Sequence, residues 1–280
     1  MGKRVRTREQ RRAELDEAME RLDEGVRAVF ESGRWERYLE VMSRFHQYSA
    51  NNSLLIAMQM PNATAVASYT DWKRKFGRQV RKGERGIRIL APVRYRKKVE
   101  DEAVVERLAG FRLASTFDVS QTDGEPLPQI AELLDGSVER YEQVMGAIEK
   151  AAPVPVGFEE MHAGVNGFFS RAERRIAIRP GMNQAQTVKT AIHELAHSRM
   201  HGFDGAAPPE DLPDRATREV QAESVAFVVA SHYGLDTGGY SFGYVASWAS
   251  GRELEELKAS MGAIRETAHG IIEDIDAALG

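Results

Sequence analysis

Residues 190–197 read Thr-Ala-Ile-His-Glu-Leu-Ala-His, an H-E-x-x-H pattern within a segment of helix-forming residues. Because residues four apart lie on one face of a helix, His193 and His197 can present both imidazoles to one metal ion. Glu194 lies one position further round, where its carboxylate reaches a water molecule beside the metal. The pattern therefore predicts a Zn²⁺ site with Glu194 as the catalytic general base of a hydrolase.

The flanking residues favour a helix around this pattern. Asn183 and Gln186 form a weak capping box, and Gly202 stands where a helix would end. The segment also carries an apolar stripe, formed by Thr187, Val188, Ala191, Ile192, Leu195 and Ala196. A chance match on an exposed helix is the alternative interpretation, and the stripe argues against it because it indicates a helix with a buried face.

A third ligand has to come from another segment. His201 lies eight residues after His193, about 12 Å along a straight helix, so we do not expect it to bind the same ion. Glu219 and Glu223 share one face of the next strongly helical segment, residues 218–227. We predict that Glu219 binds the metal and that Glu223 holds a ligand histidine by its second nitrogen, and the reverse assignment stays open.

The composition limits the class of protein. The chain has 280 residues, enough for two modest domains, and it has no cysteine, which excludes disulfides and thiolate metal sites. No apolar run is long enough to span a membrane, and the basic N-terminal residues lack the apolar segment of a signal peptide. We therefore expect a cytoplasmic protein with no membrane partner.

The charge is unevenly distributed along the chain. The whole chain carries −4, whereas residues 72–98 contain twelve lysines or arginines and one acid, a net charge of +11. Aromatic residues interleave with these cations, which suits single-stranded nucleic acid because cations contact phosphates and rings stack on bases. A solvated strand face with its aromatic residues in the core is the alternative. The candidate DNA-binding residues are Trp72, Lys73, Arg74, Arg78, Arg81, Lys82, Arg85 and Arg88.

Hydrophobic periodicity predicts an α+β fold in two domains, residues 1–125 and 126–280. The first should contain N-terminal helices and a small antiparallel sheet, and the second a metallopeptidase-like domain of the zincin type around the H-E-x-x-H helix. Residues 121–129, with one glycine and two prolines, are the expected linker. Helices are predicted at 7–30, 137–151 and 252–279, and a helical region at 35–60, where the polar residues 48–53 mark a bend or a new helix start. Strands are predicted at 87–95, 111–119 and, as a hairpin, within 154–180.

Several blocks resemble ArdC-type antirestriction proteins of mobile elements, in which a single-stranded-DNA-binding domain precedes a zinc-metallopeptidase-like domain. The blocks are residues 48–72, 78–92, 115–128, 167–178, 190–202, 218–230 and 240–249. The second half also resembles IrrE/ImmA-type metallopeptidases, whose metal-binding glutamate opens an E-x-x-A pattern. Here that pattern begins at Glu219, so the resemblance favours Glu219 over Glu223 as the ligand.

The resemblance implies a protein that binds single-stranded DNA, protects incoming DNA from host restriction and carries Zn²⁺. Two other functions are compatible with the same residues. One is a regulatory zinc endopeptidase that cleaves a repressor, so that its partner is a protein substrate. The other is a DNA-coating protein whose zinc site is not catalytic.

Overall fold

The computed structural model describes residues 7–31, 34–98, 104–127, 138–202, 212–235, 237–240 and 242–280. By its internal contacts the chain divides into two compact units. Residues 1–28 and 51–127 form the first unit, and residues 29–50 and 128–280 form the second. Both combine helices with small sheets, so the predicted α+β class is confirmed. None of the helices in these ranges is long and apolar enough to cross a membrane.

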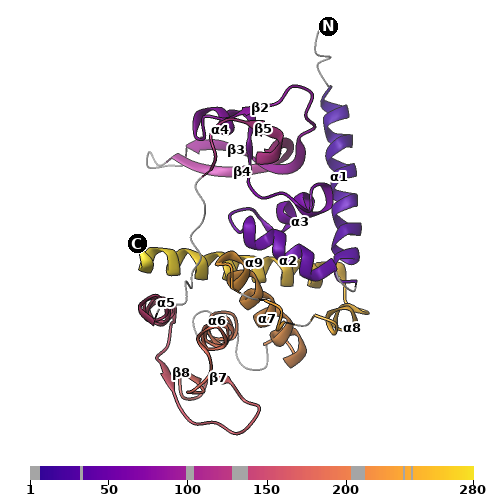
Figure 1. The fold of residues 1–280 in the computed structure, drawn as a ribbon. Coiled ribbons are helices and arrows are strands. Elements are labelled where there is room, and N and C mark those ends of the chain that lie inside the picture. Colours follow the sequence, from indigo (N-terminus) through magenta and orange to yellow (C-terminus); the bar gives the residue numbers. More distant parts are fainter. Residues whose placement is uncertain are drawn as a thin grey trace. The chain divides into compact units, whose positions relative to one another are not determined.

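The first unit joins helices to small antiparallel sheets with strand orders β1-β4-β3 and β2-β5 (Figure 1). Its helices are α1 (Arg8–Val29), α3 (Ala50–Gln59), α4 (Tyr69–Arg74) and the 3₁₀ helix η1 (Val119–Gln121). Its strands are β1 (Val66–Ser68), β2 (Gln79–Val80), β3 (Ile87–Lys98), β4 (Val104–Asp118) and β5 (Thr122–Asp123). The predicted helix at 7–30 and both predicted strands before the linker are present, because their apolar periodicity already marked them. The helical region predicted at 35–60 forms two helices, Arg34–Arg44 and Ala50–Gln59.

Two amide side chains of α3 cover the outer edge of β3. Asn52 donates to the carbonyl of Leu90 at 2.9 Å and accepts from the N–H of the same residue at 2.8 Å. Gln59, two helical turns later, makes the same pair of bonds with Arg88 at 2.9 Å each. Because Arg88 and Leu90 are alternate residues of an outer strand, these amides satisfy backbone groups that an edge strand otherwise leaves exposed.

Trp72 is a core residue of the first unit. Its side chain is 1% exposed and packs with Ala67 and Val80. The indole N–H donates to the carbonyl of Phe117 at 2.7 Å, which satisfies its one polar group. No face of this ring is open to a nucleotide base. The prediction that Trp72 stacks on DNA is therefore wrong. Although Trp72 lies among cations in the sequence, α4 directs its side chain into the core.

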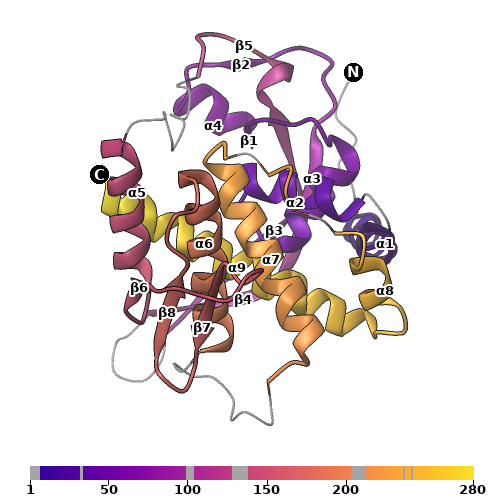
Figure 2. The ribbon, with the colours of Figure 1, turned by 60° about the horizontal axis from the view of Figure 1, so that its bottom comes forward.

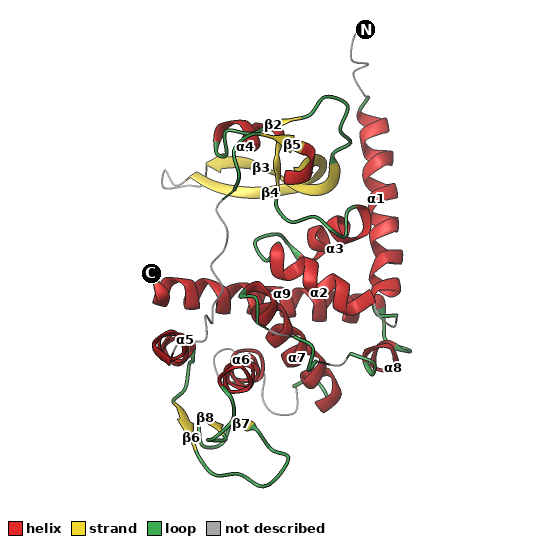
Figure 3. Ribbon diagram, viewed as in Figure 1, coloured by secondary structure: helices red, strands yellow, loops and turns green. Residues whose placement is uncertain are grey.

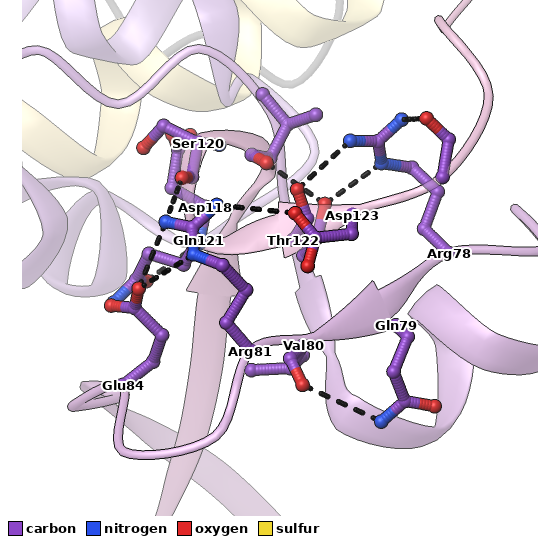
Figure 4. Close-up of polar contacts among 12 residues, drawn as sticks. Arg78, Gln79, Val80, Arg81, Glu84, Asp118, Ser120, Gln121, Thr122 and Asp123 are labelled. Atoms are coloured by element: carbon purple, nitrogen blue, oxygen red, sulfur yellow. Dashed lines mark hydrogen bonds and ion pairs between the residues drawn. The ribbon is translucent and has the colours of Figure 1, made fainter.

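Arg78 is likewise a structural residue rather than a surface cation. It is 8% exposed, and its guanidinium donates to Thr122 Oγ1 at 2.7 Å and to the Thr122 carbonyl at 3.1 Å (Figure 4). It also donates to the carbonyls of Gly124, at 2.8 Å, and Glu125. A buried cation needs such partners to offset its lost hydration. The predicted contact between Arg78 and DNA is thus corrected, since its donors are already engaged within the fold.

The start of the predicted linker, residues 121–129, is wrong, because its first residues belong to the folded first unit. Gln121 is buried, and its amide donates to Glu84 Oε2 at 3.1 Å and to the Arg85 carbonyl at 2.9 Å (Figure 4). β5 follows at once and pairs with β2. The start of this segment therefore belongs to the first unit, because its polar side chains close the turn after β2. Residues 128–129 of the predicted linker lie outside the described residues.

The second unit is built mainly of helices (Figure 3). They are α2 (Arg34–Arg44), α5 (Val138–Ala151), α6 (Gln184–His201), α7 (Arg215–His232), α8 (Val245–Ala249) and α9 (Leu254–Leu279). A mixed sheet in the order β6-β8-β7 is formed by β6 (Val156–Phe158), β7 (Gly167–Ser170) and β8 (Arg175–Ile178). β7 and β8 confirm the predicted hairpin, whereas the short β6 was missed. Helix α6 packs against α7 on one side and against β7 and β8 on another (Figure 2).

Residues 29–50 pack with the second unit although they precede the predicted boundary at residue 125. The indole N–H of Trp35 on α2 donates to Ser224 Oγ on α7 at 3.1 Å. Phe30 stacks on the Trp35 ring with centroids 4.4 Å apart. The aromatic face of α2 thus finds its apolar partner on a helix nearly two hundred residues later in the chain, a contact that local periodicity does not reveal.

We expect Arg78→Met to lower the free energy of unfolding by roughly 2–4 kcal/mol, because it leaves buried hydroxyl and carbonyl acceptors without donors. The measurement is urea denaturation followed by tryptophan fluorescence and circular dichroism. Lys82→Met, at an exposed position of the neighbouring turn, is the matched control and should change stability by no more than about 0.5 kcal/mol. Equal effects of the two substitutions would contradict the structural role of Arg78.

Candidate metal centre

Helix α6 places the H-E-x-x-H residues on a rigid support. Its N-cap is Asn183, whose side-chain oxygen accepts from the Gln186 N–H at 2.8 Å, which confirms the predicted start. Along the buried face, Val188, Ile192 and Leu195 are fully buried. The two histidines lie one turn apart on the side that faces α7, so their separation is fixed by the helix itself.

The nitrogen and oxygen atoms of three side chains converge. Nε2 of His193 and Nε2 of His197 are 3.1 Å apart, and Glu219 Oε2 on α7 lies 3.8 Å and 3.7 Å from them. Three atoms at these separations share a centre about 2.1 Å from each, the length of a Zn–N or Zn–O bond. The residues present therefore fit a transition-metal ion with two histidines and one carboxylate, and they include Glu219 as predicted.

The charge states of these groups also suit a metal. Burial lowers the pKa of His193 to about 4, so its ring is neutral near pH 7 and keeps a lone pair. The nearby His197 ring holds the pKa of the Glu219 carboxyl below its usual range. Two imidazoles and one carboxylate are the ligand set that catalytic zinc sites use when a further position is left open.

Glu194 is held between α6 and the edge strand β7. It is 7% exposed, burial raises its pKa to about 7, and the backbone N–H of Phe169 bonds to its carboxylate. Gly167 permits this contact, because a Cβ there would lie 2.6 Å from Thr190 Cγ2 and 3.0 Å from the Ala177 carbonyl. A carboxyl group beside the ligand atoms, with its orientation set by a strand, has the placement of a general base.

The second nitrogen of His197 faces His201, not a glutamate. The two Nδ1 atoms are 3.2 Å apart, His201 Nε2 lies 3.0 Å from Gln221 Oε1, and the Gln221 amide donates to Ser260 Oγ at 3.2 Å. When Nε2 of His197 binds a metal, its Nδ1–H donates to His201, whose own proton is then on Nε2 and points to Gln221. The whole chain of hydrogen bonds thus has one consistent direction.

Glu223 lies elsewhere in the same cleft. Its Oε2 accepts a hydrogen bond from the Tyr244 hydroxyl at 2.5 Å, and burial raises the pKa of that tyrosine. The position beside a ligand histidine that we predicted for Glu223 is taken by His201, which sequence reasoning excluded as a ligand but missed as a support. The spacing of four between His197 and His201 was the available signal, because it places both rings on one face.

The cleft around these residues has a volume of about 760 Å³. It is lined by residues 164–169 and by residues that include the basic Lys189, Arg215 and Arg218. It is therefore a polar cleft beside the open edge of β7, with positive charge around the candidate ligands.

The remaining candidate DNA-binding residues fall into two groups. Arg81 forms an ion pair with Glu84 at 2.8 Å, and Arg88 lies 3.6 Å from Glu14, so both have partners within the first unit. Four others are exposed on α4 and on the turn after β2, namely Lys73, Arg74, Lys82 and Arg85. Two exposed aromatic residues lie in the same stretch, Tyr69 (50% exposed) and Phe76 (42% exposed), and both are absent from the predicted DNA-binding set.

The first part of the chain matches a known protein family. Residues 6–126 match the family described as the N-terminal domain of the anti-restriction factor ArdC. Residues 6–126 form an ArdC-type N-terminal domain. The resemblance expected from the sequence blocks is therefore confirmed for the family of the first half of the chain.

The ArdC fold extends over most of the remaining chain as well. The Mn(II)-bound crystal structure of the antirestriction protein ArdC from plasmid R388 shares the fold with a TM-score of 0.59, at 18% identity over 93% of this chain and 97% of that one. An uncharacterised protein of Bacillus anthracis is 28% identical over 97% of this chain and 53% of its own length. The chain thus spans about half the length of this curated relative.

In this ArdC-like chain we expect Gln221→Leu to weaken Zn²⁺ binding by about 10–100-fold, because it removes the acceptor that orients His201 and through it His197. Isothermal titration calorimetry on the full chain measures the change. Glu223→Gln is the matched control, since its carboxylate bonds to Tyr244, and its affinity should stay near that of the unchanged protein. A larger loss in Glu223→Gln than in Gln221→Leu would restore Glu223 as the supporting residue.

Proposed function

We propose that this chain is an antirestriction protein that binds single-stranded DNA through its first unit and holds a divalent metal, Zn²⁺ in our assignment, in its second. The observation that carries the proposal is that residues 6–126 belong to the ArdC N-terminal family while His193, His197 and Glu219 converge in the second unit. The R388 protein of the same fold is described as Mn(II)-bound, which supports a divalent ion.

The proposed DNA surface consists of α4 and the turn after β2. Lys73, Arg74, Lys82 and Arg85 supply four exposed cations, and no ion pair engages them within the described residues. Phe76 packs against buried Trp72 with ring centroids 5.0 Å apart and keeps 42% of its surface exposed. A ring that packs against the core on one side and is exposed to solvent on the other is suited to stack on an unpaired base. The cations would contact phosphates.

We expect the combined change of Lys73, Arg74, Lys82 and Arg85 to alanine to weaken binding of a fluorescent single-stranded oligonucleotide. The slope of log affinity against log salt should fall by about 3, because each lost phosphate contact removes about 0.7. Fluorescence anisotropy across a salt series, with duplex DNA as competitor, measures both quantities.

The matched control changes the same number of charges at exposed positions elsewhere, namely Arg8, Arg12, Arg37 and Lys150 to alanine. This variant should keep the affinity and the salt slope of the unchanged protein. Equal losses in the two variants would mean that net charge alone drives binding, and an unchanged affinity in the first variant would remove α4 and its neighbouring turn from the DNA surface.

The second unit is proposed to act as a metal-dependent peptidase. A divalent metal held by His193, His197 and Glu219 would polarise a carbonyl and lower the pKa of water. Glu194 would accept the proton, with its carboxylate oriented by the Phe169 N–H. β7 is an edge strand beside α6, so its backbone offers hydrogen bonds to an extended peptide. The cationic wall of the cleft favours a substrate with acidic groups near the cleaved bond.

We expect Glu194→Gln to retain stoichiometric metal and to lose at least about 100-fold of any peptide hydrolysis, because the amide cannot accept the proton. His193→Ala should lose the metal ion of this site as well as the activity. Metal content by mass spectrometry and cleavage of a peptide library are the measurements. Full hydrolysis by Glu194→Gln would exclude it as the base.

The same variant separates the two roles of the protein. If Glu194→Gln still protects transformed DNA in a restriction assay, DNA coating is sufficient for protection and the metal site has another task. If it loses protection while it still binds single-stranded DNA, hydrolysis of a protein substrate is part of the antirestriction function.

A further inference from the structure

The histidines of this chain are not scattered. Six of the seven lie in two groups of three, both within the second unit. One group contains the candidate metal ligands on α6. The other consists of His46 in the turn after α2, His232 at the end of α7 and His269 on α9. Nothing in the proposed peptidase or DNA-binding function uses this second group.

The second group has the geometry of a metal site. Nδ1 of His46 and Nδ1 of His269 are 3.0 Å apart, close to the roughly 3.3 Å that separates two ligands of a tetrahedral zinc ion. Glu273 follows His269 by one helical turn, and its Oε1 lies 4.0 Å from the same Nδ1. All three ligand atoms lie within 4.8 Å of one another. His269 and Glu273 on α9 therefore place their ligand atoms close to that of His46, which is distant in the sequence.

The surroundings keep the two ligand rings available. His46 is 6% exposed, so its ring is held in place by the residues packed around it. The His232 ring packs against His46 at right angles, with centroids 4.7 Å apart, while its own Nδ1 lies 3.0 Å from the Ser43 carbonyl, to which it donates. Arg265 is the cation that opposes a metal here, and its Nε is engaged with the Tyr48 carbonyl at 2.6 Å.

An ion can reach this position from solvent. The side chains of His269 and Glu273 are 30% and 57% exposed, so the carboxylate is free to close on a metal while His46 provides a fixed buried ligand. Imidazole nitrogens prefer zinc, copper or nickel over magnesium or calcium. Because His46 belongs to the turn after α2 and the other two residues to α9, an ion held here would join two segments far apart in the sequence.

We propose that His46, His269 and Glu273 form a second divalent-metal site, selective for a zinc-like ion, that fastens the turn after α2 to α9. We assign it a structural role, because an ion held here would join two segments far apart in the sequence. The site does not depend on the peptidase assignment, because no residue is shared between the two groups of ligands.

The test is the zinc content of the full chain after equilibrium dialysis against micromolar ZnCl₂, measured by mass spectrometry. The unchanged protein should hold two zinc ions, and His193→Ala should hold one. Adding Glu273→Gln to His193→Ala should remove the remaining ion. Glu273 is exposed, so this substitution leaves the fold intact. His162→Ala, at the exposed seventh histidine outside both groups, is the matched control and should keep both ions.

Two results would overturn the proposal. One is a His193→Ala protein that binds no zinc at this concentration, and the other is a His193→Ala, Glu273→Gln protein that still binds one. Thermal unfolding gives a second readout: zinc should raise the Tm of His193→Ala but not that of the double variant. If only the assignment of His193, His197 and Glu219 were wrong, the result would be different. His193→Ala would then keep the zinc content of the unchanged protein, whereas Glu273→Gln would lose one ion.

Discussion

The close packing of α6 against α7 is the constraint on which the metal centre depends. The helix alone sets the separation of His193 and His197, but Glu219 reaches the same point only because α7 runs alongside. Small residues such as Ala222 and Ala226 on α7 are fully buried, and small side chains allow short distances between helix axes. The ligand geometry is thus a property of packing, so residues that never touch a metal determine whether one binds.

The basic section of the first unit shows how one run of cations can serve two purposes. Trp72 and Arg78 are buried and hold α4 and the β2 turn in place, whereas Lys73 and Lys82 are exposed on the same elements. Trp72 and Arg78 thus support the surface, and Lys73 and Lys82 give it positive charge. The proposed DNA surface, on such a rigid support, would lose less conformational entropy on binding.

The features that could be predicted from the sequence are those that local interactions determine. The spacing of His193 and His197 and the cap at Asn183 lie within one helix, so they could be read directly. Burial was harder to predict. In a run of basic residues the sequence does not distinguish an exposed aromatic or cationic side chain from one that lies in the core, as Trp72 does. The support of His197 by His201 and Gln221 depends on where α7 lies, and no local pattern reports that position.

We propose that α6 and α7 together hold a metal ion. Anomalous diffraction at the zinc absorption edge, from crystals of the full chain grown with zinc, would locate the ion. We expect a peak in contact with Nε2 of His193, Nε2 of His197 and Oε2 of Glu219. A map without a peak between these atoms, or a peak bound by Glu223 in place of Glu219, would contradict it.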